Sequence, residues 1–186
     1  EMRTPLNAII GFSNLLALGA LKPEKTSEYA SDINASGRRL LEILSEILDM
    51  AQIEAGNVEL SDDKVLPAAV VENAIRAIES EQPGHGKSIQ ISDRSGGVGL
   101  RCDESRLQQV LAHLLSNAMK FTDADSVIEV AIDRVEDGID FVVRDNGSGI
   151  SPEMLSLVLE PFGQAETAYA RSHGGIGLGL PIVKAL

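Results

Sequence analysis

The sequence predicts an α+β protein in which a helical hairpin at residues 1–58 precedes an α/β domain at residues 61–186. Apolar residues in the first part recur at helical spacing, whereas the second part mixes helical spacing with the alternation typical of β-strands. The 186 residues are 44% hydrophobic, which is enough for a core in each part. Because aromatic residues make up only 3%, these cores are expected to be aliphatic.

The first part is predicted to contain two helices. Thr4 can cap a helix over residues 4–18, and the proline that follows it suits a first helical turn. The stretch 19–23 breaks the helical pattern and predicts a turn. A longer helix is predicted over residues 24–55, with Gly56 ending it as a C-terminal glycine cap. The two helices are therefore expected to form a hairpin.

The longer helix carries an apolar stripe that one hairpin cannot cover. Leu40 and Ile47 lie in this stripe at heptad spacing, and further leucines widen it. Two hairpins would bury the stripe between them in a homodimeric four-helix bundle. The alternative is that the stripe packs against the second part of the chain.

The second part is predicted to alternate helices and strands. Asp103 is placed to cap a strong helix, and a turn is predicted at residues 136–138. Residues 151–176 have little periodicity and are expected to form a mobile loop with one helical turn. The predicted helices lie near 68–80, over 104–120 and from about 178 onward, and the predicted strands lie near 88–92, 97–101, 127–134 and 139–144.

Charge and composition exclude several classes of partner. The formal net charge of −12 argues against binding to nucleic acid or to an anionic membrane surface. No apolar run reaches the roughly 18 residues of a membrane span, so we expect no membrane contact by this segment and a cytoplasmic location, whether or not a longer protein is anchored. The single cysteine, Cys102, is interpreted as a small structural residue at a strand end, which suits a reducing compartment.

The helix over 104–120 has a polar face beside its apolar one. His113, Asn117, Lys120 and Phe121 share this polar face, because each lies one or two helical turns from the first. The amide oxygen of Asn117 suits Mg²⁺ that is already surrounded by phosphate oxygens and water. Lys120 can meet a phosphate, and Phe121 can stack on a purine. The alternative is an ordinary polar helix face. The apolar face is predicted to consist of Leu107, Val110, Leu111, Leu114 and Ala118.

A carboxylate backed by glycines follows the last predicted strand. Asp145 stands at the end of that strand, where it can accept a hydrogen bond from the exocyclic N–H of adenine. Gly147 and Gly149 would let the backbone approach the base closely. The alternative for this segment is a simple turn between a strand and a helix.

A glycine-rich segment opens the last predicted helix. Gly175, Gly177 and Gly179 leave backbone N–H groups open toward phosphate at a helix start. No Gly-Lys-Ser/Thr sequence follows, so this is not a Walker loop, and no preceding strand supports a dinucleotide fingerprint. Each of the three motifs is weak alone, but their order and spacing together predict an ATP site.

These segments together resemble the sensor histidine kinases of the GHKL superfamily, which also contains gyrase, Hsp90 and MutL. The resemblance extends over essentially the whole chain and is strongest to the PleC/DivJ-type kinases. The start of the chain is similar to the phosphoacceptor box, which reads His-Glu-x-Arg-Thr-Pro-Leu. The matching boxes are residues 1–6 (phosphoacceptor), 113–121 (asparagine), 145–150 (first glycine), 160–162 (phenylalanine) and 175–180 (second glycine).

The resemblance implies a GHKL-type α/β sandwich that binds ATP and Mg²⁺. Asp145 and Phe121 would bind adenine, Asn117 would hold the metal, and Lys120 and Arg171 would offset the phosphate charge. The family's last strands would follow Leu186, so the sandwich is expected to be truncated here. The remaining residues implied to bind the cofactor are Gly147, Gly149, Phe162, Gly175, Gly177, Leu178 and Gly179.

The resemblance also implies how phosphate would leave ATP. The acceptor histidine would stand immediately before Glu1, and its phosphoryl group would pass to the receiver domain of a response regulator. Glu1 would act as the acid/base partner of that histidine. Thr4 would orient water for the reverse, phosphatase reaction.

Two residues depart from the family pattern inside the ATP motifs. His113 replaces the first asparagine of its box, and Ile176 replaces a threonine or serine that would offer phosphate a hydroxyl. One expectation is weaker ATP binding that Ile176→Thr would improve, and the other is that Ile176 packs this segment. Both departures, and an acceptor histidine outside these residues, leave open a pseudokinase scaffold that binds a regulator without phosphotransfer. A gyrase- or Hsp90-type ATPase is disfavoured, because His113 stands where those enzymes have a glutamate base.

Overall fold

The computed structural model describes residues 2–19, 22–81, 87–123, 125–164 and 175–186. The chain divides into two compact units, with the boundary between Gly56 and Asn57. Within the described residues, no helix is long and apolar enough to cross a bilayer.

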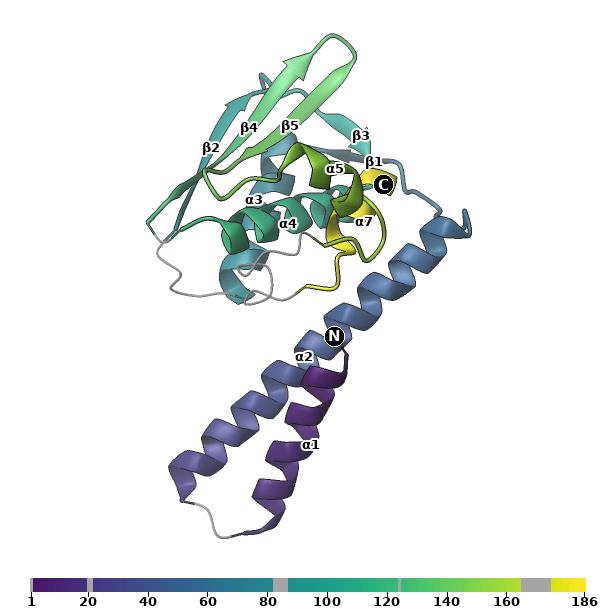
Figure 1. Ribbon diagram of the computed structural model, residues 1–186. Coiled ribbons are helices and arrows are strands. Elements are labelled where there is room, and N and C mark those ends of the chain that lie inside the picture. Colours follow the sequence, from purple (N-terminus) through teal and green to yellow (C-terminus); the bar gives the residue numbers. More distant parts are fainter. Residues whose placement is uncertain (1, 20–21, 82–86, 124, 165–174) are drawn as a thin grey trace. The chain divides into compact units, whose positions relative to one another are not determined.

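The first unit is a hairpin of two helices, α1 (Arg3–Ala17) and α2 (Pro23–Glu54), shown in Figure 1. Pro23 occupies the first helical position of α2, where its missing N–H is not needed. Gly56 lies two residues after Glu54, the last residue of α2, and has a φ of 67°, as the predicted glycine cap requires. The predicted cap at Thr4 is wrong, since α1 begins at Arg3 and Thr4 lies within its first turn.

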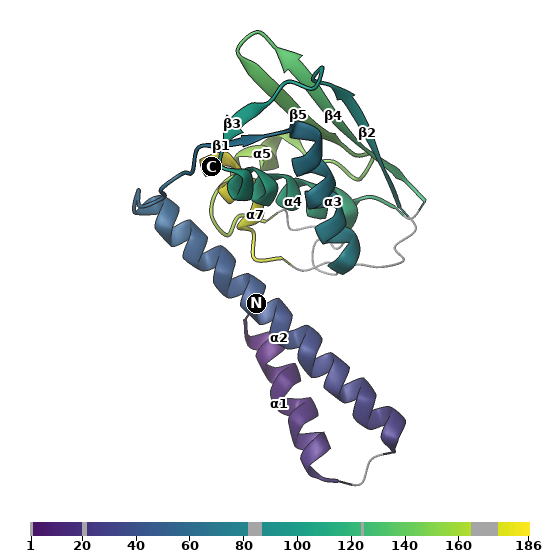
Figure 2. The same cartoon turned by 180° about the vertical axis from the view of Figure 1, so that it is seen from behind.

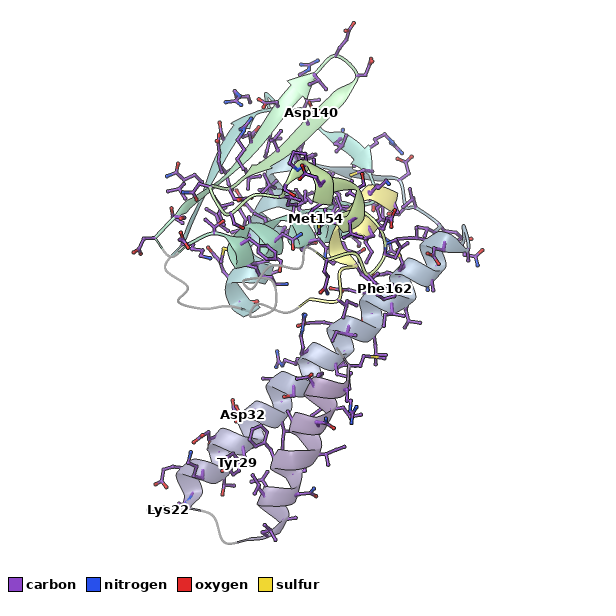
Figure 3. The ribbon with its side chains drawn as sticks, viewed as in Figure 1. Lys22, Tyr29, Asp32, Asp140, Met154 and Phe162 are labelled. Atoms are coloured by element: carbon purple, nitrogen blue, oxygen red, sulfur yellow. The ribbon has the colours of Figure 1, made fainter. Side chains whose placement is uncertain are left out.

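The hairpin leaves most of its apolar side chains accessible. Among its described residues, only Pro5 and Ile43 are buried. Phe12 of α1 stacks on Tyr29 of α2 with ring centroids 5.1 Å apart (Figure 3). The apolar residues that stay exposed on this unit include Leu6, Ile10, Leu15, Leu41, Leu44 and Leu48.

The second unit stacks helices on one face of a sheet (Figures 1 and 2). The sheet has the strand order β2-β4-β5, formed by Ser88–Arg94, Val127–Val135 and Gly138–Arg144. β2 runs parallel to β4, and β4 and β5 form the predicted antiparallel hairpin. The helices α3 (Pro67–Glu81) and α4 (Glu104–Phe121) pack on this sheet through an aliphatic core.

A second, two-stranded sheet was only half predicted. β3 (Leu100–Cys102) matches a predicted strand, but its antiparallel partner β1 (Asp63–Val65) was not foreseen. Three residues are too short for an alternating pattern to stand out. Cys102 lies in β3, and burial raises the pKa of its thiol, which fits a structural rather than a reactive role.

The helix α4 is capped as predicted but rotated from its predicted orientation. The Asp103 carboxylate accepts hydrogen bonds from the backbone N–H groups of Arg106 at 2.9 Å and Ser61 at 3.0 Å. The buried residues of α4 are Leu111, Leu115, Ala118 and Met119, whereas Val110 and Leu114 are only half-buried. Two shorter helices, α5 (Pro152–Val158) and α7 (Gly179–Ala185), complete the unit. The part of residues 151–176 that is described therefore holds more helix than the expected single turn.

Candidate nucleotide site

The end of α4 meets the turn that follows β5. The carbonyl of Phe121 accepts a hydrogen bond from the backbone N–H of Ser148 at 3.3 Å. A Cβ atom at Gly147 would lie 2.3 Å from the Phe121 carbonyl oxygen, so only glycine fits this position. The Asp145 carboxylate accepts a hydrogen bond from the Gly147 N–H at 2.8 Å, which holds the turn in place. Gly147 is thus required by the contact between two protein segments.

A small cavity opens at this junction. It has a volume of about 190 Å³ and is lined by Phe121, Asp123, Asn146, Gly147 and Ser148. Phe121 and Gly147 were predicted to contact the base, and the structure brings both to one cavity. Asp123 and Asn146 line it as well, although no motif argument singled them out. Gly149, two residues on, has a φ of 67° that favours glycine for conformational reasons.

The residues of the predicted polar face of α4 are partly exposed. His113, Asn117 and Lys120 are all half-buried there. The imidazole of His113 lies against Gly179, because a Cβ at Gly179 would be 3.3 Å from the ring nitrogen Nδ1. This contact brings α4 and the glycine-rich segment together, as a site built from both motifs requires.

Two hydrogen bonds hold the glycine-rich segment to residues 162–164. The Phe162 N–H donates to the Gly177 carbonyl at 3.0 Å, and the Gln164 side chain donates to the Gly175 carbonyl. Gly177 has a φ of 71°, and a Cβ there would lie 2.7 Å from the Gly163 carbonyl oxygen. Gly175, by contrast, has open space around it. Gln164 is a contact that the motif analysis missed.

The apolar residues of the glycine-rich segment point inward. Leu178 is fully buried and Ile176 is 7% exposed. Any contact between Leu178 and a nucleotide is therefore restricted to its backbone. The burial of Ile176 favours the packing alternative over a lost phosphate contact.

Phe162 combines exposure with an unusual backbone conformation. Its side chain is 64% exposed at the surface of the second unit (Figure 3), and its φ is 65°. A bulky residue in this region is rare and is held there by its surroundings. Strain of this kind is concentrated at functional sites.

Of three other predicted site residues, one lies in the first unit and two lie outside the described residues. Thr4 is exposed on α1 of the first unit. Glu1 and Arg171 fall outside the described residues. In the described ranges, no group of three or more His, Cys, Asp or Glu side chains could hold a metal ion.

Comparisons with known proteins identify both units. Residues 1–56 match the histidine kinase A phosphoacceptor domain, and residues 102–186 match the histidine kinase-, DNA gyrase B- and HSP90-like ATPase domain. A sensor-like histidine kinase of Rhizobium meliloti is 38% identical over all of this chain and 36% of its own length. The histidine protein kinase DivJ of Caulobacter vibrioides is 35% identical over all of this chain and 31% of its own. This chain thus spans about a third of the length of these relatives.

A solved structure supports the same assignment. The crystal structure of full-length ShkA in complex with AMPPNP aligns with a TM-score of 0.74 and 29% identity over 98% of this chain and 38% of its own. The predicted resemblance, the predicted hairpin-plus-sandwich fold and the ATP-binding class of the second unit are confirmed. This chain therefore belongs to the sensor histidine kinases, as a phosphoacceptor hairpin followed by an ATPase domain of the histidine kinase, gyrase and Hsp90 type.

Proposed function

We propose that this chain is the catalytic core of a histidine protein kinase in a two-component system. It transfers the γ-phosphoryl group of ATP to a histidine, from which the receiver domain of a response regulator takes it. The observation that carries this proposal is that two other motif segments meet at α4. The Asp145 turn contacts its C-terminal end, and the glycine-rich segment contacts its polar face at His113.

The adenine would be bound at the cavity between Phe121 and Gly147. One oxygen of Asp145 already holds the Gly147 N–H, which fixes the carboxylate and leaves its other oxygen to accept the exocyclic N–H of adenine. The Phe121 ring supplies an aromatic surface for stacking. AMPPNP in the ShkA structure supports an adenine nucleotide as the ligand of this class of domain.

The phosphates would lie along the glycine-rich segment. The backbone N–H groups of Gly175, Gly177 and Gly179 would bind phosphate oxygens, and Lys120 with Arg171 would offset their charge. The described residues offer no cluster that could hold a metal alone, which fits Mg²⁺ held by the Asn117 oxygen together with phosphate and water oxygens. When bound, Mg²⁺ neutralises charge on the phosphoryl group.

The accepting histidine would precede Glu1 in the longer protein. Glu1 would exchange a proton with that histidine, and Thr4, exposed in the first turn of α1, would orient water when the core acts as a phosphatase. Two such hairpins would dimerise into a four-helix bundle.

The test of the nucleotide site uses Asp145→Asn and Asn117→Ala in the intact protein. Asparagine puts an N–H where adenine needs an acceptor, so we expect ATP affinity to fall by about 10–100-fold in Asp145→Asn. Asn117→Ala should lose autophosphorylation and the Mg²⁺ dependence of ATP binding. Calorimetric titration with ATP, with and without Mg²⁺, measures both.

Asp140→Asn is the matched control for this test. Asp140 is an exposed carboxylate on the same strand β5, labelled in Figure 3, and its replacement makes the same chemical change. ATP affinity should stay unchanged in this variant. Unchanged affinity and activity in Asp145→Asn and Asn117→Ala as well would refute the assignment.

A pseudokinase scaffold is the alternative function. Its support from the substitutions at His113 and Ile176 is weakened by how these two side chains pack. Ile176 fills a buried position and His113 lies against Gly179, so each substitution has a structural explanation. A scaffold would bind a receiver domain without transferring phosphate. Incubating the intact protein with labelled ATP distinguishes the two functions, because only the kinase becomes labelled.

A further inference from the structure

Lys87 lies outside every motif, yet its side chain is hydrogen-bonded to the end of α4. It stands immediately before β2, and its side chain is partly buried. The ammonium group donates hydrogen bonds to the carbonyl oxygen of Thr122, at 2.6 Å, and to that of Met119. These two carbonyls belong to residues on either side of Lys120 and Phe121.

The last carbonyls of a helix need donors from elsewhere. The final four carbonyl groups have no partner within the helix, and the negative end of the helix dipole attracts a cation. A lysine is well suited, since its ammonium group carries three donors on a flexible stem. Lys87 therefore fixes the point at which α4 ends and the chain turns toward β4.

The neighbouring contacts make this point rigid. Thr122 is 1% exposed and adopts an extended conformation after the last helical residue. The Ser88 N–H, next to Lys87, donates to the Ser126 carbonyl at 3.2 Å, where the parallel pairing of β2 with β4 begins. The segment that leaves Phe121 is thus held at both ends by the start of β2.

Phe121, which lies between the two residues whose carbonyls bind Lys87, also lines the cavity at the proposed adenine site. Its carbonyl oxygen accepts a hydrogen bond from the Ser148 N–H. A shift in the last turn of α4 would move the Phe121 ring and the Lys120 ammonium group together. It would also disturb the close approach of Gly147 to the Phe121 carbonyl.

We infer that Lys87 is a positioning residue for nucleotide binding, which acts by fixing Lys120 and Phe121 at the end of α4. This inference rests on the proposed function, since it assigns Lys87 a part in the same ATP site. The Lys87 ammonium group donates hydrogen bonds to the backbone carbonyls of Met119 and Thr122. Its loss should therefore weaken ATP binding through the two residues that it positions, Lys120 and Phe121.

The experiment compares Lys87→Met, which keeps the apolar stem, with Lys87→Arg, which keeps the charge and the donors. The matched control is Lys64→Met, the same change at an exposed lysine of β1. Affinity for ATP with Mg²⁺ is measured by calorimetry on the intact proteins, with thermal melting of each variant alongside. Phe121→Ala, Asp145→Asn and the double variant Lys87→Met/Phe121→Ala complete the set.

We expect Lys87→Met to weaken ATP binding about tenfold, while Lys64→Met has no effect and Lys87→Arg keeps most of the affinity. In the Phe121→Ala background, Lys87→Met should cause a smaller loss than in the unchanged protein, because Phe121 is one of the two residues that Lys87 positions. If Lys87→Met does not fold, Lys87→Gln, which retains an amide donor, takes its place in the same comparison.

Two outcomes overturn the inference, and they are distinguishable. In the first outcome, Lys87→Met melts at a lower temperature but binds ATP as tightly as the unchanged protein, while Asp145→Asn and Phe121→Ala bind it weakly. Lys87 would then have only a structural role. Full affinity in Asp145→Asn and Phe121→Ala instead refutes the proposed ATP site, and the role of Lys87 with it.

Discussion

At the scale of single residues, the glycines of the nucleotide site differ in what they are needed for. Gly147 and Gly177 are required by close backbone contacts, and Gly177 and Gly149 by their positive φ. Gly179 has a different constraint, because the imidazole of His113 occupies the space beside it. His113 and Gly179 are therefore a matched pair that joins α4 to the glycine-rich segment.

We predict that Gly179→Ala weakens ATP binding in the presence of His113 and does so less in a His113→Ala background. The added methyl group would meet the ring at 3.3 Å, so that one of the two segments must move. Residues in direct contact usually show coupling energies of about 0.5–3 kcal/mol. The four proteins of this cycle are compared by calorimetric titration with ATP.

Gly138→Ala is the control for this cycle, because a Cβ at Gly138 would have nothing within 4 Å and this residue lies outside the proposed nucleotide site. It should bind ATP as the unchanged protein does. Equal losses from Gly179→Ala with and without His113 would show that the two residues are not coupled.

How far the sequence predicts the site is clearest from Ile176 and Lys87. The order and spacing of the three motifs predicted that they meet, and in the fold Phe121 and Gly147 line one cavity while Gly179 lies against His113 of α4. Whether Ile176 faces phosphate or the interior could not be predicted, because a segment without periodicity has no defined inner face. Lys87 escaped notice because its partners are backbone carbonyls, which leave no pattern in the sequence.

At the scale of helices and strands, the best predictions came from residues that cap helix ends and from the alternation of apolar and polar residues in strands. Asp103 and Gly56 marked helix ends as found, and the alternating residues predicted β4 and β5. The orientation of α4 was less well predicted, because both of its faces carry apolar residues and tertiary contacts decide between them. β1 was missed because its pairing with β3 is defined by a distant segment.

The cap of α4 has a predictable dependence on pH. Hydrogen bonds from the backbone N–H groups of Ser61 and Arg106 hold the pKa of the Asp103 carboxyl below its usual value. A lowered pKa in the folded state means that the stabilisation is present above the unfolded pKa, at about 3.9, and is lost as pH falls through the folded pKa. The cap therefore contributes at neutral pH and not in strong acid.

We predict that Asp103→Ala lowers the melting temperature of the second unit by a few degrees at pH 7. Below about pH 4 the difference from the unchanged protein should narrow, because protonation then removes the charged acceptor in both. Thermal melting across this pH range gives the result. Asp140→Ala, at an exposed position of β5, should show no such narrowing, and a constant difference for Asp103→Ala would contradict the role of the charged cap.

At the scale of the whole molecule, the hairpin has too little core of its own. Only Pro5 and Ile43 are buried among its described residues, although both helices carry many apolar side chains. A cavity of about 420 Å³ on α1 is lined by Ala8, Gly11, Phe12 and Leu15. Leu40 and Ile47, which the sequence placed in the exposed stripe, are half-buried within the hairpin. Leu41 and Leu48, 65% and 62% exposed, are better markers of the surface that a second hairpin would cover.

We predict that replacing Leu41 and Leu48 by glutamate converts a dimer into monomers. In the monomer both side chains reach water, so the hairpin should still fold, whereas in a four-helix bundle the two charges would lose their hydration without a partner. Sedimentation of the intact protein measures the change, and circular dichroism checks that helical content is kept. Leu60→Glu is the matched control, because Leu60 is 60% exposed but lies outside the hairpin unit. The bundle would be contradicted by an unchanged protein that is already monomeric, or by equal dissociation in the Leu60→Glu control, since neither result places the contact on the α2 surface.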